Sequence, residues 1–219
     1  MIRILSLCCC IFCLQGCFPI SFYKTAYQTS INQRNSSALE ITPVIRDLPF
    51  AMQSLQHKNN NVLLVLAYDD KGKLSFMDSE SQVFTFYHGK IIGTNNLENN
   101  LLIKDPANIQ SIFFNLSNNQ DTHIKHESFI RYTNPMTSFL TMKSSYKLLP
   151  QKNKLFQRKL DQAKINYFIL EEKFEVPSFH WKGSNYYWLS IDGNILKSKQ
   201  YIFPDKPKYF FETLKLYKG

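Results

Sequence analysis

Glycine, cysteine and the common catalytic motifs are scarce in this chain. Its 219 residues include only 7 glycines and 5 cysteines, and all the cysteines (Cys8, Cys9, Cys10, Cys13 and Cys17) lie within the first 17 residues. The remainder therefore has no thiol for a disulfide framework or a cysteine metal site. It also contains no glycine-rich phosphate loop, no G-x-S-x-G and no H-E-x-x-H. The usual signatures of nucleotide-dependent enzymes, serine hydrolases and zinc proteases are thus missing.

The N-terminus, which reads MIRILSLCCCIFCLQGC, has the order of a secretory signal peptide. One basic residue, Arg3, precedes an apolar run from Ile4 to Leu14 that is too short to span a bilayer, because a spanning helix needs about 20 apolar residues. Leu14-Gln15-Gly16-Cys17 then resembles the bacterial lipobox, in which the cysteine is acylated and becomes the first mature residue. This resemblance implies removal of residues 1–16 and a diacylglycerol on Cys17. The alternative is an ordinary signal peptide or an apolar anchor that contains cysteines.

Lipidation at Cys17 would place the mature chain in the bacterial envelope. An exported chain without further cysteines fits a periplasmic protein whose core is large enough to need no disulfide. Phe18 follows the cysteine in place of an aspartate, and resemblance to enterobacterial sorting then implies the outer membrane in place of the inner one. The periplasmic face is the expected side, with the cell surface as the alternative. Residues 17–41 are polar and rich in Asn, Gln and Ser, which is typical of a tether. Residues 42–219 would form a single domain.

Positive charge exceeds negative charge, with 26 Lys and Arg against 17 Asp and Glu. Such a balance favours anionic partners, such as lipid headgroups, acidic polysaccharide or nucleic acid. Export excludes nucleic acid as a sensible partner. The membrane, reached through the lipid anchor, and an anionic polysaccharide are therefore the partners that the charge indicates.

Short apolar stretches separated by turn residues predict a mainly β domain, an antiparallel β-barrel or sandwich. The predicted strands are residues 50–56, 61–68, 74–77, 83–87, 91–92, 124–132, 137–148, 166–174, 185–191, 195–203 and 209–217. One or two short helices are expected, one at Thr42–Leu48 with Thr42 as N-cap and Pro43 in the first turn, and one at Lys154–Ala163. The apolar parts of the asparagine-rich middle, 101–103 and 109–116, carry no assignment.

Few side chains are spaced for catalysis or metal binding. Asp121-x-His123-x-x-His126-Glu127 holds nitrogen and oxygen donors, but residues i and i+3 of a strand point to opposite faces, so the two histidines would not meet at one metal. Ser144-x-x-Lys147 matches S-x-x-K but lacks the companion S-D-N and K-T-G motifs. The sequence therefore predicts no catalytic residue, no metal site and no cofactor.

A polysaccharide-modifying enzyme would need a cleft with paired carboxylates about 5–9 Å apart. Glu171, Glu172 and Glu175 are close in sequence. We expect them to be exposed on a strand, which argues against an enzyme of this class.

Two sets of side chains are candidates for binding a saccharide or a partner. Tyr186, Tyr187 and Trp188 present aromatic rings to both faces of one strand, and exposed rings stack on sugars or serve protein interfaces. The alternative is that they complete the core. Lys197 and Lys199 share one face of a neighbouring strand and could meet acidic polysaccharide or lipid phosphates. The alternative is a solvated sheet edge that lysines protect from aggregation.

Several short motifs give the chain a family resemblance. Leu48-Pro49-Phe50-Ala51, His88-Gly89-Lys90, Tyr187-Trp188 and Gly193–Gln200 resemble, in order and spacing, the GfcB/YjbF lipoproteins, which are encoded with genes for group 4 capsule or related exopolysaccharide export. The resemblance implies a barrel-like β domain at the outer membrane that acts as a non-catalytic accessory in export. It also implies that the partners are other polysaccharide-export proteins of the outer membrane or periplasm.

A second function is a periplasmic carrier that holds a lipid or acyl chain in the cavity of the barrel. The interior of the domain distinguishes the two functions. An apolar cavity large enough for an acyl chain would favour the carrier, whereas an interior filled by side chains would favour the docking module.

Overall fold

The computed structural model describes residues 43–58, 60–118, 122–133, 136–150, 155–204 and 206–217. The expected signal peptide, Cys17 and the tether therefore lie outside the described residues, as do Thr42 and Asp121. In these described ranges, no helix combines the length and apolar character that a membrane crossing requires.

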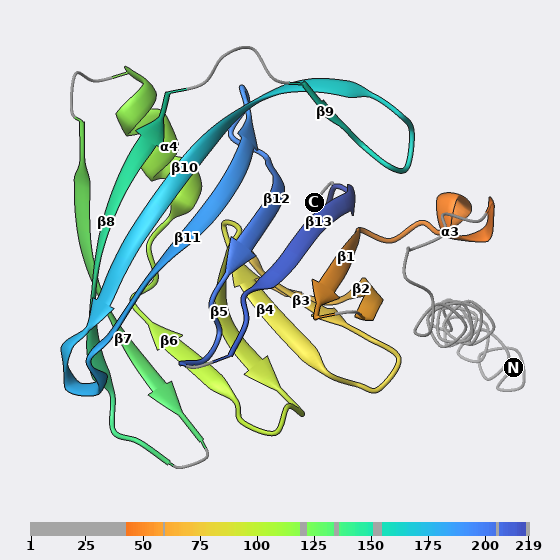
Figure 1. The fold of residues 1–219 in the computed structure, drawn as a ribbon. Helices are drawn as coiled ribbons and strands as arrows, with labels where there is room; N and C mark the ends of the chain where they lie inside the picture. The colour runs from red at the N-terminus through yellow and green to blue at the C-terminus, as the bar shows by residue number, and fades with distance from the viewer. Residues whose placement is uncertain are drawn as a thin grey trace, which may run out of the picture.

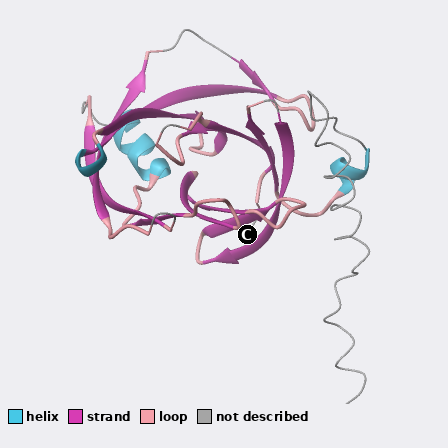
Figure 2. Cartoon of the chain, turned by 60° about the horizontal axis from the view of Figure 1, so that its bottom comes forward, coloured by secondary structure: helices cyan, strands magenta, loops and turns pink. Residues whose placement is uncertain are grey.

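The described chain forms a closed antiparallel β-barrel (Figures 1 and 2). Twelve of the 13 strands follow one another around the ring in the order β11-β12-β13-β1-β2-β3-β4-β5-β6-β7-β8-β10, and pairing of β10 with β11 closes it. The strands are β1 (Met52–His57), β2 (Asn60–Asp70), β3 (Lys73–Met77), β4 (Val83–Tyr87), β5 (Lys90–Asn95), β6 (Leu101–Lys104), β7 (Ile124–Tyr132), β8 (Leu140–Leu149), β9 (Leu155–Gln157), β10 (Lys164–Val176), β11 (Trp181–Ser190), β12 (Ile195–Gln200) and β13 (Tyr209–Lys215). The prediction of a mainly β antiparallel domain is confirmed, and the barrel is the form it takes.

Two-residue turns join β2 to β3 and β4 to β5. Lys71 and Gly72 have φ values of 52° and 83°, and His88 and Gly89 have φ values of 45° and 82°. Two consecutive residues with positive φ make the hairpin turn whose twist matches the flanking strands. His88 is therefore a turn residue.

Helix α4 (Ile109–Asn118) fills one end of the barrel (Figure 2). Eight strands already enclose enough space for side chains to fill, so a ring of twelve leaves a wider lumen. The helix buries Ile109, Ile112, Phe113 and Leu116 inside that end, where they join an apolar cluster with residues of β8, β10 and β11.

The sequence carried a signal for this helix that we did not assign. The buried residues fall at positions i, i+3, i+4 and i+7, which is the spacing of one helix face. Asn108 precedes them, and its Oδ1 accepts a hydrogen bond from the backbone N–H of Ser111 at 2.9 Å, as an N-cap does.

The turn between β4 and β5 fills more of the lumen by contacting the distant strand β12. Gln200 accepts a hydrogen bond from the backbone N–H of Ile91 at 3.1 Å and donates one to the carbonyl of Gly89 at 2.9 Å. A side chain at Gly89 would come within 2.3 Å of Ile195. Only glycine therefore allows this close approach.

The other half of the lumen holds the main apolar cluster, which is rich in aromatic rings. Phe84, Phe86 and Phe211 pack edge to face, with ring centroids of Phe86 and Phe211 5.1 Å apart. Such pairs contribute about 0.5–1.5 kcal/mol beyond the burial of their area.

Helix α3 (Pro43–Asp47) packs on the outside of the ring. Ile45 and Leu48 pack against Met52, Leu63 and Leu214, which lie on the outer faces of β1, β2 and β13. The prediction of a short helix here is confirmed from Pro43 onward.

The predicted helix at Lys154–Ala163 is wrong. Strand β9 pairs with the start of β10 instead, and Arg158 forms an ion pair with Asp161 in the turn between them. Phe156 is buried, and its two neighbours on this short strand are exposed. Alternation of buried and exposed residues is typical of an extended strand. Helix propensity alone favours a helix here, but it takes no account of how Phe156 packs.

We expect Gly89→Ala to be more destabilising than Gly72→Ala. Both glycines have nearly the same φ, but nothing lies within 4 Å of a Cβ placed at Gly72. Gly72→Ala should therefore lower the unfolding free energy by about 1–2 kcal/mol through strain, and Gly89→Ala by about 2–4 kcal/mol because overpacking adds to it. Urea denaturation would measure both. Equal losses would show that the contact with Ile195 is not tight.

Candidate functional site

A buried carboxylate, that of Glu172, lies between the two apolar clusters of the lumen. Along β10, Leu170 belongs to the cluster around α4 and Phe174 to the main cluster, and Glu172 stands between them on the same inward face. Its side chain has no exposed surface. The expectation that Glu171 and Glu172 are exposed is wrong for both, because their side chains are buried.

Three side chains donate hydrogen bonds to Oε1 of Glu172. Lys90 forms a buried ion pair with it, and the hydroxyls of Ser144 and Tyr146 each lie 2.8 Å away. The Lys90 ammonium also donates to the Tyr146 hydroxyl at 3.1 Å. Charge-assisted bonds of this kind are about twice as strong as neutral ones.

Two further side chains donate to Oε2 of Glu172. The Tyr187 hydroxyl lies 2.7 Å and the Asn185 amide nitrogen 2.9 Å from this atom. The Asn185 carbonyl oxygen in turn accepts the backbone N–H of Tyr201 at 2.8 Å. Five side-chain donors therefore surround one carboxylate, and we call these residues with Glu172 the Glu172 network.

The strand register brings the Glu172 network together. Glu172 is directly opposite Tyr146 of β8 and Asn185 of β11. Lys90 belongs to β5, on another part of the ring, and reaches the carboxylate through the lumen. A slip of one residue in β10 would turn Glu172 to the outer face. The network is thus complete only in one register.

The environment keeps Glu172 ionised. Burial by itself would raise the pKa of this carboxyl, but the charge of Lys90 and the hydrogen bonds from Lys90, Asn185 and Tyr187 outweigh it and lower the pKa to about 2. Burial and the nearby carboxylate raise the pKa of the Tyr146 and Tyr187 hydroxyls well above the usual value. The tyrosines are therefore neutral donors.

Three of the four motifs that carry the family resemblance have a side chain in or beside this network. Lys90 comes from His88-Gly89-Lys90 and Tyr187 from Tyr187-Trp188, while Gln200 ends the Gly193–Gln200 stretch and lies 3.3 Å from the Tyr187 hydroxyl. All three side chains are buried. These three side chains therefore belong to the interior of the barrel, whereas Trp188, Lys197 and Lys199 of the same motifs face outward.

The five residues singled out for binding divide between the two faces of the wall. Tyr187 is fully buried, as in the alternative that it completes the core. Tyr186 and Trp188 point outward and pair across the strands with Lys199 and Lys197. We call Tyr186, Trp188, Lys197 and Lys199 the outer-wall patch.

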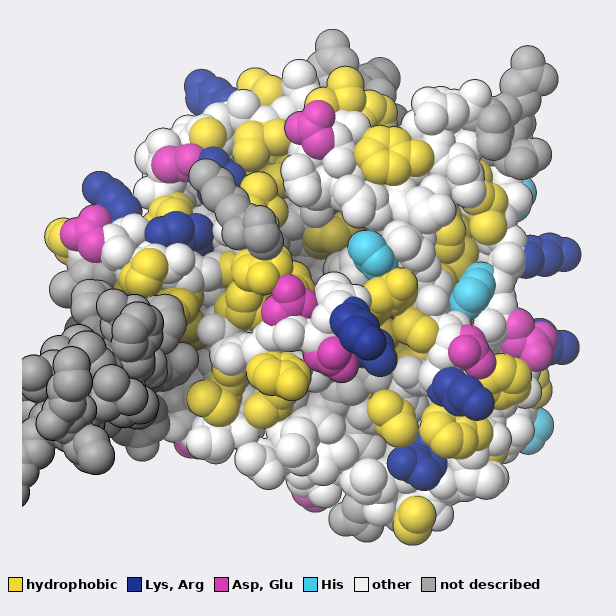
Figure 3. All heavy atoms as spheres, turned by 180° about the vertical axis from the view of Figure 1, so that it is seen from behind, with side chains coloured by type: hydrophobic (Ala, Val, Ile, Leu, Met, Phe, Trp, Pro, Cys, Tyr) yellow, Lys and Arg dark blue, Asp and Glu magenta, His cyan; other side chains and the backbone are white. Residues whose placement is uncertain are grey.

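Lys197 is held among aromatic rings in the outer-wall patch. Its ammonium lies 4.8 Å from the ring centroid of Trp188 and 5.5 Å from that of Phe156 on β9. Burial is the main cause that lowers the pKa of Lys197. Lys199 remains exposed. On the face of the molecule seen in Figure 3, basic side chains are interspersed with acidic and apolar ones.

The remaining motifs do not assemble into a reactive site. Ser144 points inward to Glu172, whereas Lys147 forms an outer ion pair with Glu171 at 3.2 Å. Glu175 pairs with Lys182 at 3.1 Å. His126 lies 2.9 Å from the carbonyl of Asp105. Within the described ranges, no three His, Cys, Asp or Glu side chains are grouped as a metal site.

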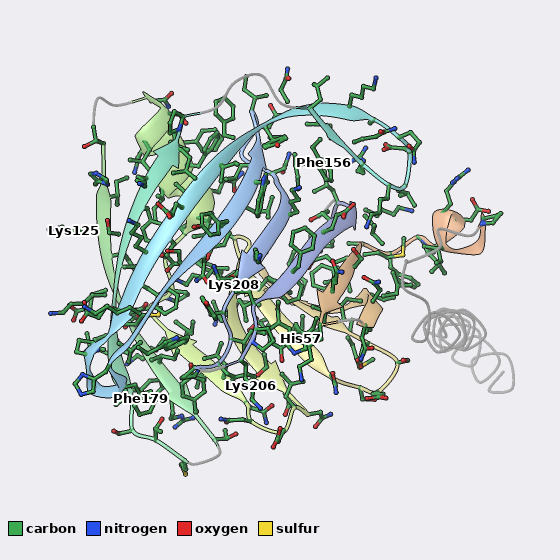
Figure 4. The ribbon with its side chains drawn as sticks, viewed as in Figure 1. His57, Lys125, Phe156, Phe179, Lys206 and Lys208 are labelled. Atoms are coloured by element: carbon green, nitrogen blue, oxygen red, sulfur yellow. The ribbon has the colours of Figure 1, made fainter. Side chains whose placement is uncertain are left out.

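A cleft of about 560 Å³ opens at the end of the barrel opposite α4. Strand β7 shows this placement, because Ile124 at its start packs against the α4 cluster and Tyr132 at its end lines the cleft. His57 of β1, Lys206 and the 3-10 helix η2 (Pro177–Phe179) contribute side chains (Figure 4). We call this the mouth cleft. Its residues are too far apart in sequence to form a motif, so sequence reasoning missed it.

Comparisons with known proteins give one family and a structural likeness. The family model described as "Group 4 capsule polysaccharide lipoprotein gfcB, YjbF" matches residues 26–214. The barrel is similar to the hypothetical lipoprotein YmcC from Escherichia coli, with a TM-score of 0.64 and 15% identity over 80% of this chain and 90% of that chain. A putative exported protein with a YmcC-like fold from Bacteroides fragilis matches with a TM-score of 0.38 and 13% identity over 77% and 94% of the two chains. A search of curated proteins finds no match.

Removing one partner of the buried ion pair should be strongly destabilising. Glu172→Gln or Lys90→Met would each leave the other group buried without its counter-charge, which costs about 3–5 kcal/mol. The double variant should lose less than the sum of the two single losses. Lys147→Met, which breaks the more exposed pair with Glu171, is the matched control and should cost at most about 1 kcal/mol. Urea denaturation of the four variants would test this, and additive losses would contradict it.

Stability should fall on acidification as Glu172 gains a proton. The carboxyl has a folded-state pKa of about 2 against a reference value of 4.5, so its stabilisation is present above pH 4.5 and is lost as the pH falls towards 2. The loss should be roughly 3 kcal/mol. The double variant Lys90→Met/Glu172→Gln lacks this titration. Its unfolding free energy should depend less on pH between 5 and 2, and parallel pH curves would oppose this explanation.

Proposed function

The chain belongs to the group 4 capsule polysaccharide lipoprotein family (GfcB, YjbF), and from this membership we propose that it is a non-catalytic accessory in the export or assembly of capsule or a related exopolysaccharide. Lipidation of Cys17 would anchor it to the outer membrane, with the barrel on the periplasmic face. In this proposal it acts by docking to other export proteins.

The lumen beneath the mouth cleft is filled by side chains, and this observation supports docking over a lipid carrier. Helix α4 occupies one end, the aromatic cluster occupies the other half, and the charged Glu172 network lies between them. An acyl chain in the lumen would have to displace these side chains or lie against a carboxylate, which is unfavourable. The interior therefore fits the docking module by the criterion set from the sequence.

The outer-wall patch is the candidate partner surface of this proposal. Tyr186 and Trp188 supply half-buried aromatic rings and Lys199 an exposed positive charge on adjacent strands. Aromatic residues flanked by polar ones are typical of protein interfaces.

Deletion of the gene should lower the fraction of polysaccharide found at the cell surface. Complementation with the wild-type chain should restore that fraction, and complementation with Cys17→Ala should not, because the barrel would lose its membrane anchor. Surface and retained polysaccharide would be quantified separately, and membrane fractionation of both chains would report the anchor. A matched Cys13→Ala variant, altered within the expected leader, should behave as the wild type.

Two results would contradict this proposal. Unchanged surface polysaccharide after deletion would remove the export function. Full restoration by Cys17→Ala would mean that the barrel works without its anchor.

A further inference from the structure

The mouth cleft has the shape of a ligand site. Its volume of about 560 Å³ falls within the range of about 300–1,000 Å³ that is usual for ligand pockets. The ends of β1, β4 and β7 form its walls together with η2 and the connection that leads into β13. Side chains that reach it from both halves of the sequence therefore converge on one space.

Aromatic rings form two parts of the wall. The His57 and Tyr209 rings are stacked with centroids 4.0 Å apart and an interplanar angle of 13°. Tyr132 and Phe179 are also nearly parallel, at 6.3 Å and 20°. Phe179 is 41% exposed, so its ring is accessible to a ligand in the cleft.

Polar and basic groups alternate with these rings. Lys58 and Lys206 are both exposed at the rim, and Asn60 and Asn99 supply amides. Among the described residues of the lining, Glu98 is the only acidic one. Burial, followed by the charges of Lys58 and Lys206, lowers the pKa of His57. The local field is therefore positive, and the imidazole is neutral at pH 7.

We propose that the mouth cleft binds a short segment of acidic saccharide, with sugar rings against the aromatic walls and a carboxylate near Lys206 and Lys58. Sugar rings have apolar C–H faces and polar edges, which suits aromatic faces interleaved with amides. The carboxylate adds the charge complementarity. The choice of a saccharide rests on the proposed export function, whereas the cleft chemistry stands independently of it.

An acyl chain fits this site less well. Its lining places lysine and asparagine side chains beside the rings, and an acyl chain offers these groups neither a hydrogen-bonding partner nor an opposite charge. The floor is closed by side chains of the main apolar cluster, including Leu55, Val62 and Phe84. A saccharide polymer, by contrast, can lie across the mouth of the barrel, so that one segment occupies the cleft and the rest continues on either side.

Binding would be measured by titration calorimetry on the full-length chain in detergent micelles. The probes are tetragalacturonate as the acidic saccharide, maltotetraose as a neutral one of equal length, and tripolyphosphate as an anion without sugar rings. We expect tetragalacturonate to bind at least about tenfold more tightly than either of the others, since it alone satisfies both the rings and the charge.

Variants locate the site. Lys206→Gln and Phe179→Ala should each weaken tetragalacturonate binding by about five- to tenfold, since one charge or one stacking surface is lost. Both residues are exposed, and thermal unfolding would verify that the variants remain folded. Lys125→Gln removes the same charge from an exposed position on β7, away from the cleft (Figure 4), and should leave the affinity unchanged.

Several outcomes would overturn the inference. Absence of tetragalacturonate binding would do so directly, and equal binding of tripolyphosphate would show that charge alone is recognised. Equal binding of maltotetraose would remove the acidic selectivity. Loss of affinity in Lys199→Gln but not in Lys206→Gln would move the ligand to the outer-wall patch.

The two proposals can fail separately. Lowered surface polysaccharide in the deletion strain without saccharide binding to the purified chain would reject the mouth cleft and leave the export function standing. Binding through the cleft with unchanged surface polysaccharide would reject the export function and leave the ligand assignment standing.

Discussion

The Glu172 carboxylate is the interaction on which the rest of the barrel depends. Burying an ionised group is costly unless its charge is compensated and each oxygen is hydrogen-bonded. Here a lysine provides the counter-charge and four further side chains provide donors. The donors come from β5, β8 and β11, so the carboxylate is stable only when these strands are correctly placed around β10. We infer that the network contributes specificity of register more than net stability.

A wide ring creates the second constraint, because its lumen must be filled. Helix α4 fills one end, and the β4–β5 turn reaches β12 through the hydrogen bonds of Gln200. The opposite end remains hollow, so the mouth cleft lies where the filling stops. The same architecture thus excludes a ligand from the interior and leaves room for one at the rim.

Much of the fold could be predicted from the sequence, since alternating and turn-bounded strands have strong local signals. The strands Val83–Tyr87 and Ile124–Tyr132 have the predicted bounds. The hairpin turns at Gly72 and Gly89 lie where the turn residues Asp and Gly, and the pair His88-Gly89, predict them. Helix α4 was missed because an apolar run in an asparagine-rich segment was left unassigned. The helix predicted at Lys154–Ala163 failed because burial of Phe156 on the outer wall is a tertiary effect.

The site was less predictable than the fold. Nothing in the neighbouring sequence marks Glu172 as buried, because strand pairing brings most of its partners to it. Its counter-charge, Lys90, is 82 residues away in the sequence. The family motifs did point to Lys90 and Tyr187, but as motifs they could not say that these side chains face inward. The mouth cleft depends on residues from Leu55 to Tyr209, and only the closed ring brings them together.

The pairing of β1 with β13 means that the ring can close only when both strands are present. The first strand of the ring lies between the second and the last, so the barrel cannot close until the final strand has been delivered. Until then the outer edge of β1 has unpaired backbone groups, which can recruit other chains. Contacts this distant in sequence also form slowly. A chain exported from its N-terminus would therefore need protection from aggregation during transit, and a truncation that removes β13 would leave this edge permanently open.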